Sequence, residues 1–302
     1  MIKEISAKLQ ELLQFSSDDK ILFNGKEINV SQNNFKTINP VIGKSIAFID
    51  GGQAEILTSS NFCLSFIRVF GVVFKDNRKI HSVKKEFYVL TTCKKVDEEL
   101  IYSSALYGDE LIDKEDLVFN ANDPLLQTGN RKVAVSKISN IARRFAELSL
   151  ASQMESDFIV LDGTLEKSYP GEGKYLEKLA NVSALAKTTD LVTVNGNNPA
   201  NVLQFSGCWN YPLTEKTSFV KLHERGDHIF RFEGSREVLS FLLHNSSDPI
   251  FLGYPYGLIY ADKMARVSNN ERKSLEVQFM IRNKKLQYYL NSKNAHTILD
   301  SV

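Results

Sequence analysis

Apolar residues gather into strand-like runs over the first third of the chain. The segment from Lys44 is rich in apolar residues up to Asp50, and two similar segments follow at 62–74 and 80–92, separated by the turn-like sequence KDNRK. Valine, isoleucine and phenylalanine are common in these segments, and residues of these types are enriched in strands. The pattern therefore predicts an antiparallel meander whose first strand ends at Asp50.

Helical spacing takes over further along the chain. Segment 133–154 predicts a helix, because apolar residues recur there every three to four positions, at Ile138, Ile141, Phe145, Leu148 and Met154. The strand DFIVLDG follows directly. Beyond it the pattern predicts a short helix at 172–181, an extended DLVTV, two strands within 217–233 joined by the turn ERGD, and helices at 235–244 and 257–282.

Two segments stand apart from this core. Residues 1–16 predict an amphipathic helix, because Ile2, Ile5, Leu9, Leu12 and Leu13 fall on one face at helical spacing. Residues 94–130 are charged and irregular, which predicts a loop-rich insertion. The order of strands, helix, strand and helices favours a single α/β domain over 1–302, with a mixed sheet covered on both faces.

Composition narrows the class of protein. Hydrophobic residues make up 43% and charged residues 24% of the 302 residues, which is typical of a globular protein with a substantial core. The formal net charge is +1, so contacts with nucleic acid would have to come from local basic clusters. Three scattered cysteines without a CxxC pair argue against a zinc site or a disulfide framework, and we expect a cytoplasmic protein without a transmembrane segment.

Candidate chemistry centres on two similar stretches, IAFIDGG at 46–52 and IVLDGT at 159–164. An apolar strand that stops at Asp-Gly places a carboxylate at its carboxyl end, where open α/β sheets bind ligands. If the two strands are neighbours, Asp50 and Asp162 come together. The alternative is that each Asp only opens a turn, which is a common role of Asp-Gly.

Three kinds of phosphate chemistry use such sequences. Haloacid-dehalogenase phosphatases carry DxDGT, but their nucleophilic Asp would stand at Val160. Actin-like ATPases and sugar kinases place Thr or Ser after their glycines, whereas this chain has Gln53. A metal-dependent nuclease needs further acids. Glu147, on the helix before the second strand, is a candidate, because a lone buried carboxylate is costly without a partner or a metal, although an exposed Glu is equally compatible with the pattern.

The ordered motifs resemble those of the NurA family, nucleases of archaeal and some bacterial DNA-end processing with an RNase H-like fold. The matching stretches span residues 44–271 and are IAFIDGG, RRFAELSLA, FIVLDGTL, ALAKTTD and, most specific, LGYPYGLIYADKMARVSNNE. The resemblance implies an RNase H-like mixed β-sheet flanked by helices. It also implies a 5′ to 3′ exonuclease, with single-strand endonuclease activity as an additional option, that acts in DNA end resection and double-strand break repair.

Cofactors, partners and site residues follow from the same resemblance. It implies Mn²⁺ or Mg²⁺, with two ions, a homodimer and a HerA-type hexameric ATPase. The implied metal-binding acids are Asp50, Glu147, Asp162 and Asp262, the last at a position where many relatives have Asp or His. Lys187 would face the phosphate and Tyr254 would be a further site residue; the alternatives are a solvated lysine and a packing aromatic. An all-carboxylate donor set suits Mg²⁺ or Mn²⁺.

Other candidates are weaker. His223 and His228 bracket a turn and lack a third nearby ligand, so they are left out of the site. Three basic pairs, Lys84-Lys85, Lys94-Lys95 and Arg143-Arg144, could contact a DNA backbone or simply be solvated. No GxxxxGK[ST] motif occurs, so an ATPase partner would supply any motor. A non-catalytic subunit that binds DNA ends or the ATPase remains the alternative from another class.

Overall fold

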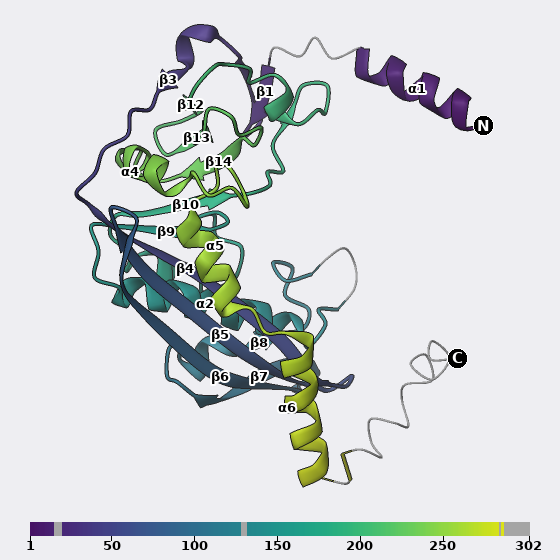
Figure 1. Ribbon diagram of the computed structural model, residues 1–302. Coiled ribbons are helices and arrows are strands. Elements are labelled where there is room, and N and C mark those ends of the chain that lie inside the picture. Colours follow the sequence, from purple (N-terminus) through teal and green to yellow (C-terminus); the bar gives the residue numbers. More distant parts are fainter. Residues whose placement is uncertain (15–19, 128–131, 284, 287–302) are drawn as a thin grey trace. The chain divides into compact units, whose positions relative to one another are not determined.

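The computed structural model describes residues 1–14, 20–127, 132–283 and 285–286. The fold is α/β, with a large mixed β-sheet and flanking helices, as the sequence predicts (Figure 1). The chain divides into two compact units. The first unit comprises Met1–Lys44, Val160–Leu165 and Asn181–Tyr256, and the second comprises Ser45–Ile159, Glu166–Ala180 and Gly257–Val302.

The first unit contains most of the short strands. Five follow the order β3-β12-β13-β14-β10 in the large sheet, with bounds Lys36–Thr37, Trp209–Pro212, Thr217–Lys221, Phe230–Glu233 and Val182–Ala186. A small separate sheet has the order β11-β1-β2, from Val192–Thr193, Lys20–Phe23 and Lys26–Asn29. Helices α1 (Ile2–Gln14) and α4 (Glu237–Asn245) belong to the same unit.

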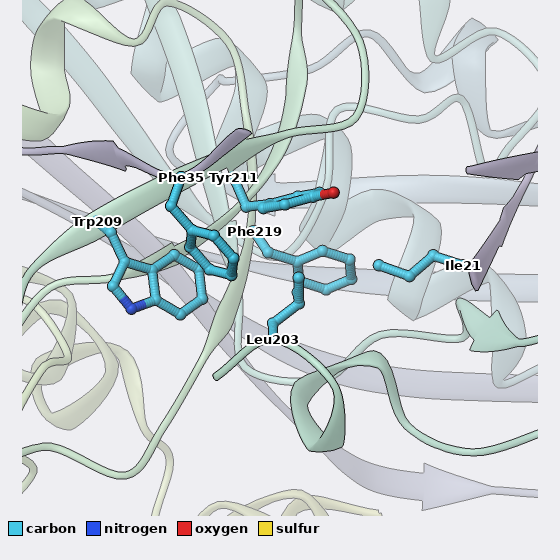
Figure 2. Packing of buried hydrophobic residues seen from close by; sticks show 6 residues of the cluster. All are labelled: Ile21, Phe35, Leu203, Trp209, Tyr211 and Phe219. Atoms are coloured by element: carbon cyan, nitrogen blue, oxygen red, sulfur yellow. The ribbon is translucent and has the colours of Figure 1, made fainter. Parts of the chain in front are cut away.

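Aromatic side chains form the core of the first unit. The cluster in Figure 2 joins residues that are far apart in the sequence, namely Ile21, Phe35, Leu203, Trp209, Tyr211 and Phe219. The ring of Phe35 meets that of Trp209 edge-on at 4.9 Å between centroids, an arrangement that aromatic pairs favour. The Trp209 indole N–H donates to the Phe205 carbonyl, so its polar edge is satisfied inside the core.

The second unit is built on long antiparallel strands in the order β4-β5-β6-β7-β8. Their bounds are Ser45–Thr58, Phe62–Lys75, Arg78–Val96, Glu99–Gly108 and Phe119–Asn120. Its helices are α2 (Lys137–Gln153), α3 (Gly173–Leu176), α5 (Tyr256–Ala265) and α6 (Asn269–Arg282), of which α5 begins at the last residue of the first unit. Strand β9 (Phe158–Asp162) contributes residues to both units.

Helices cover both faces of the β4–β5 region within the second unit. On one face, a Cβ at Gly71 would lie 3.0 Å from the Met154 sulfur, so the end of α2 packs closely on β5. On the other face, a Cβ at Gly257 in α5 would overlap the ring of Phe48. Small residues let helix and strand backbones approach at these points.

The first strand differs from its prediction. β4 does not end at Asp50 but continues to Thr58, with Gly51 paired to Val69 and Gly52 to Arg68. The glycines therefore do not form a turn. Glycine is required at both positions because other groups lie where a Cβ would stand.

Two further segments differ from the sequence pattern. The start of the charged segment 94–130 is a regular hairpin, with Val96 paired to Glu99 and the turn residues Asp97 and Glu98 at positive φ. The predicted helix 257–282 is two helices, because Ser268 caps α6 by accepting from the Glu271 amide. Among the described residues, no helix combines the length and apolar character needed to cross a membrane.

Candidate active site

Three of the predicted site residues come together in the first unit. The Tyr254 hydroxyl donates to Oδ1 of Asp162 at 2.9 Å, and the Lys187 ammonium donates to Oδ2 at 2.6 Å. The same ammonium lies over the Tyr254 ring, 4.9 Å from its centroid. We call Asp162, Lys187 and Tyr254 the Asp162 cluster.

Strand ends place the two charged members of the cluster. β9 is buried through Leu161 and ends at Asp162, after which Gly163 adopts φ +100° and donates its amide to the Leu185 carbonyl at 3.1 Å. Lys187 is the first residue after β10. The carboxylate and the ammonium therefore emerge where two strands stop, as the Asp-Gly pattern predicts for Asp162.

Tyr254 combines packing with a polar contact. Its side chain has no exposed surface, and its ring lies 5.3 Å from that of Phe230 and 5.2 Å from that of Phe251. The preceding Gly253 has φ +92°, a left-handed conformation that favours glycine. The rings of Phe230 and Phe251 thus fix the Tyr254 ring and aim its hydroxyl at Asp162, so the two interpretations of Tyr254 are compatible.

A buried ion pair holds the loop that follows Asp162. The Glu233 carboxylate accepts from the Leu165 amide at 2.7 Å and pairs with Arg231 at 2.6 Å. Both side chains are almost fully buried, and Arg231 also reaches Asp190. A buried carboxylate requires such partners. Sequence analysis missed these residues, although the alternation in FRFE places Arg231 and Glu233 on one face of β14.

Asp50 lies within β4 of the second unit. Its side chain is buried, with 9% exposed, and its Oδ1 accepts from the Gly51 amide at 2.7 Å. Its backbone stays in the ladder, paired with Phe70. The turn-opening interpretation of Asp50 is therefore wrong, and so is the expectation that its strand stops there.

The two glycines after Asp50 show which face each residue occupies. A Cβ at Gly51 would lie 2.5 Å from Oε1 of Glu147 in α2, whereas a Cβ at Gly52 would lie 2.1 Å from the Ala265 carbonyl at the end of α5. Successive residues of a strand point to opposite faces. Asp50 consequently shares the face of Gly52, and Glu147 reaches β4 from the opposite face.

Helix α5 runs along β4 on the face of Asp50. Gly257 meets Phe48, and Ala265 meets Gly52. Eight helical residues rise about 12 Å and four strand residues about 13 Å, so the two segments match in length. Asp50, midway between Phe48 and Gly52, therefore lies opposite the middle of α5.

Asp262 stands in that part of α5. Its carboxylate pairs with Arg266 at 2.6 Å, one helical turn later, and it is 39% exposed. Within the second unit, Asp50 and Asp262 thus belong to the same face, one on the strand and one on the helix that covers it.

Glu147 is buried, which excludes the exposed alternative. Its Oε1 lies 3.2 Å from the Arg143 guanidinium, and that guanidinium also donates to the Gly51 carbonyl at 2.8 Å. Arg144, 4.0 Å from the other carboxylate oxygen, binds the fully buried Glu172 at 2.8 Å. Helix α2 therefore presents an acid, Glu147, and a cation, Arg143, to the strand at Gly51.

Glu172 is a second residue that sequence analysis missed. Its carboxylate accepts from the amides of Ser168 and Tyr169 at 2.7 and 3.1 Å as well as from Arg144. Burial raises the pKa of the Tyr169 phenol, an effect that neighbouring Arg143 reduces. The loop sequence YPGEGK gave no sign of burial, because its glycines and charges are typical of an exposed turn.

The carboxylates suit a hard divalent cation by ligand type. In this structure, however, Glu147, Asp162 and Asp262 are each paired with a basic side chain. Within the part of the chain that the structure describes, no three His, Cys, Asp or Glu side chains are grouped so that they could hold a metal. A metal centre built from these acids therefore stays a prediction. Metal binding would require the paired lysine and arginine side chains to move away from the carboxylates.

No protein-family model and no curated protein sequence matches the chain. Among solved structures, the NurA nuclease from Sulfolobus solfataricus matches with a TM-score of 0.52 at 13% identity, over 94% of this chain and 93% of that chain. The fold is that of a NurA nuclease. This confirms the resemblance predicted from the ordered motifs at the level of fold.

Weaker similarities involve other nucleases. Endonuclease V from Ciona intestinalis, in complex with a 24mer DNA, matches with a TM-score of 0.38 at 14% identity, over 87% of this chain and 95% of that chain. Human ENDOV matches with a TM-score of 0.39 at 14% identity, over 76% and 85% of the two chains. Scores at this level do not establish a common fold, so the fold assignment rests on the NurA structure.

The two histidine candidates lie outside the clusters described above. His223 accepts from the Arg225 amide in its turn, and the His228 ring packs edge-on against Phe251 at 4.7 Å. Of the basic pairs, Arg143 binds Glu147 and Arg144 binds Glu172. Within the NurA fold they hold buried carboxylates, so they are not simply solvated.

Proposed function

We propose that this protein is a nuclease that cleaves phosphodiester bonds in DNA. The observation that carries the proposal is the Asp162 cluster, in which one carboxylate oxygen accepts from a tyrosine hydroxyl and the other from a lysine ammonium, within a NurA fold. In such an arrangement the lysine can neutralise the charge of a phosphate, and the carboxylate at the strand end can serve as a ligand of a hard cation.

The residues of the Asp162 cluster have separate roles in this proposal. Lys187, which is 39% exposed, compensates the negative charge that develops on the phosphate. Tyr254 is a positioning residue, because its buried ring and its hydroxyl hold Asp162 in one orientation. Glu233 fixes the following loop through Leu165 and so supports the same carboxylate.

We further propose that catalysis depends on Mn²⁺ or Mg²⁺, with two ions, for which the resemblance to NurA implies Asp50, Glu147, Asp162 and Asp262 as ligands. Asp50 and Asp262 belong to one face of β4 and Glu147 reaches β4 from the opposite face, so the geometry of β4 supports Asp50 and Asp262, but not Glu147, as ligands of one ion. The ligand type supports this, since carboxylate oxygens are the donors that hard cations prefer. Bound ions would activate water and stabilise the leaving oxygen. In this proposal the chain supplies the carboxylates. The basic side chains that now pair with them, Lys187, Arg143 and Arg266, would move away when the ions bind.

The resemblance to NurA supports a more specific role. We propose a 5′ to 3′ exonuclease, with single-strand endonuclease activity as an additional option, that resects DNA ends in double-strand break repair as a cytoplasmic homodimer. A HerA-type hexameric ATPase would be its partner. The exposed apolar side chains of Ile2, Ile5 and Leu9 on α1 support a protein interaction, with 77%, 54% and 53% of their surface exposed.

A second candidate function is a non-catalytic subunit that binds DNA ends or the ATPase. The ion pairs of Glu147, Asp162 and Asp262 favour it, because acids already neutralised by protein cations can be purely structural. A haloacid-dehalogenase-like phosphatase is not favoured, since Val160 replaces the nucleophile and is buried inside β9.

The test is cleavage of DNA labelled at the 5′ or 3′ end, single- or double-stranded, in Mn²⁺, Mg²⁺ or EDTA. The nuclease proposal predicts metal-dependent products whose label distribution reports polarity. The binding-subunit proposal predicts retention of intact DNA in a gel-shift assay under every condition, with the ATPase present as well. A parallel assay with a small phosphomonoester separates phosphatase activity from both.

A further inference from the structure

The end of the β5–β6 hairpin carries an unusual concentration of positive charge. The segment from Lys75 to Lys85 contains five lysine and arginine residues and one acid, Asp76, in a chain whose net charge is only +1. The side chains of Lys75, Arg78 and Lys79 are exposed. The positive charge of this segment is therefore local and accessible to a polyanion.

The backbone of a tight turn sets the positions from which these side chains project. Asp76 and Asn77 form the two-residue turn with φ +49° and +61°, the conformation of a tight hairpin whose twist matches its strands. Lys75 stands directly opposite Arg78 in the ladder. Like charges in that position destabilise a hairpin, so the pair is not explained by folding stability.

Contacts within the hairpin leave much of this charge uncompensated. Lys79 donates to the neutral hydroxyl of Tyr260 at 3.3 Å and lies 5.1 Å from the centre of its ring. Lys84 shares the Glu86 carboxylate with Arg68, and Lys85 lies 3.3 Å from the Asp109 carboxylate, so these two lysines are already compensated. A phosphate could therefore approach Lys79 without displacing a carboxylate from it.

The hairpin end is adjacent to the helix that carries Asp262. The Tyr260 ring packs against Phe70 and Phe74 of β5, so this flank of α5 faces the hairpin. Asp262 follows two residues later, about 200° further around the helix, and therefore lies on the opposite flank. A helix is about 10 Å across, so Lys79 and Asp262 are separated by roughly the width of α5.

We propose that the β5–β6 hairpin end, defined by Lys75, Arg78 and Lys79, contacts the sugar-phosphate backbone of DNA next to the catalytic acids. This inference rests on the proposed function for the identity of the polyanion. The contact is sequence-independent, because lysine and arginine bind phosphates without reading bases. An alternative is that the cations only protect the exposed edge of β6 against association, which is a common use of lysine on edge strands.

The test measures DNA binding by fluorescence anisotropy in EDTA, where the proposed cleavage is absent, over a range of salt concentrations. The variant is R78Q/K79Q, and the matched control is K26Q/K36Q, which removes two exposed cations from β2 and β3. The proposal predicts that R78Q/K79Q weakens duplex binding on the order of tenfold and lowers the salt slope by about 1.8, since each phosphate contact contributes about 0.9. The control should retain the wild-type slope.

Equal effects of the two variants, or none from R78Q/K79Q, would overturn the inference while leaving the nuclease proposal intact. Failure of the wild-type protein to bind DNA would overturn the inference as well. Conversely, a wild-type protein that cuts no DNA but loses binding in R78Q/K79Q would support the contact and count against the nuclease. An unchanged thermal midpoint of the variant, measured in the same buffer, separates lost contacts from misfolding.

Discussion

The hydroxyl of Tyr254, a residue without exposed surface, donates to the Asp162 carboxylate across 2.9 Å. This relationship links the aromatic group of Phe230, Phe251 and Tyr254 to the acid at the end of β9. The opposite oxygen of Asp162 binds Lys187. The orientation of the carboxylate is therefore set from two sides before any substrate arrives.

Replacing Tyr254 by Phe should preserve the ring packing and remove only the hydrogen bond. We expect the free energy of unfolding to fall by about 1 kcal/mol. The loss of transition-state stabilisation in DNA cleavage should be larger than this loss of stability, because Asp162 loses its neutral donor. Urea unfolding and single-turnover cleavage measure the two effects. Tyr107→Phe, at an exposed tyrosine on β7, is the matched control. An unchanged cleavage rate in Tyr254→Phe would restrict the residue to packing.

Lys187 should matter through its charge. Lys187→Met is expected to slow cleavage on the order of a hundredfold, the usual effect of removing one group that stabilises a developing negative charge. Lys187→Arg should recover part of this loss, since it restores the cation with a different shape. Lys216→Met, at an exposed lysine of the same unit, should cleave as the wild type does. Full activity of Lys187→Met would remove this residue from the site.

The glycines of β4 should respond differently to substitution. Gly52→Ala places a methyl group against the Ala265 backbone, which cannot swing aside, so we expect a loss of about 1 to 3 kcal/mol or more in stability. Gly51→Ala meets the Glu147 side chain, so we expect a smaller loss of stability with a clear loss of activity. Gly71→Ala meets the flexible end of Met154 and should be the mildest. Equal stability of the Gly51 and Gly52 variants would contradict this order.

Asp109 supplies a pH-dependent contribution to stability. A hydrogen bond from the Glu86 amide, supported by Lys85, lowers the Asp109 pKa below its usual 3.8. A carboxyl with a lowered folded-state pKa stabilises the protein above its unfolded pKa, and this stabilisation is lost as the pH falls through the folded pKa. The stability difference between wild type and Asp109→Asn should therefore be constant near neutral pH and shrink below pH 3.8.

Urea unfolding at a series of pH values measures that difference. Asp97→Asn, at an exposed turn residue with φ +46° that Asn also tolerates, is the control and should show no comparable trend. A difference between wild type and Asp109→Asn that grows as the pH falls would contradict the sign of the effect.

The elements that the sequence predicts well are those with a simple period. The apolar spacing around Phe145 corresponds to α2, and the apolar run before Asp162 corresponds to β9, because burial repeats regularly along both. Asp50 shows the limit of this reasoning. Asp-Gly-Gly is typical of a turn, but a close approach of α2 and α5 requires glycine inside a continuous strand, and that approach is invisible in a local pattern.

Buried charges were the other limit. The local sequence of Glu172 gives no direct sign of its partner, since Arg144 is 28 positions away in sequence. For Glu233, the alternation in FRFE indicates Arg231 as a partner but not Leu165, which is 68 positions away. By contrast, the break between α5 and α6 was predictable. Ser268 and Glu271 form the S-x-x-E pattern that marks a helix start. The prediction of one helix over 257–282 followed the apolar spacing and did not use this pattern.

The most direct test of the nuclease proposal compares Asp50→Asn, Asp162→Asn and Asp227→Asn in cleavage of end-labelled DNA with Mn²⁺. Asp227 is exposed, belongs to the same unit as Asp162 and serves as the control. The proposal predicts that the first two variants bind DNA in EDTA as the wild type does but lose metal-dependent cleavage, while Asp227→Asn cleaves normally. Wild-type cleavage by the folded Asp50 and Asp162 variants, or no cleavage by the wild-type protein with any metal, would contradict it.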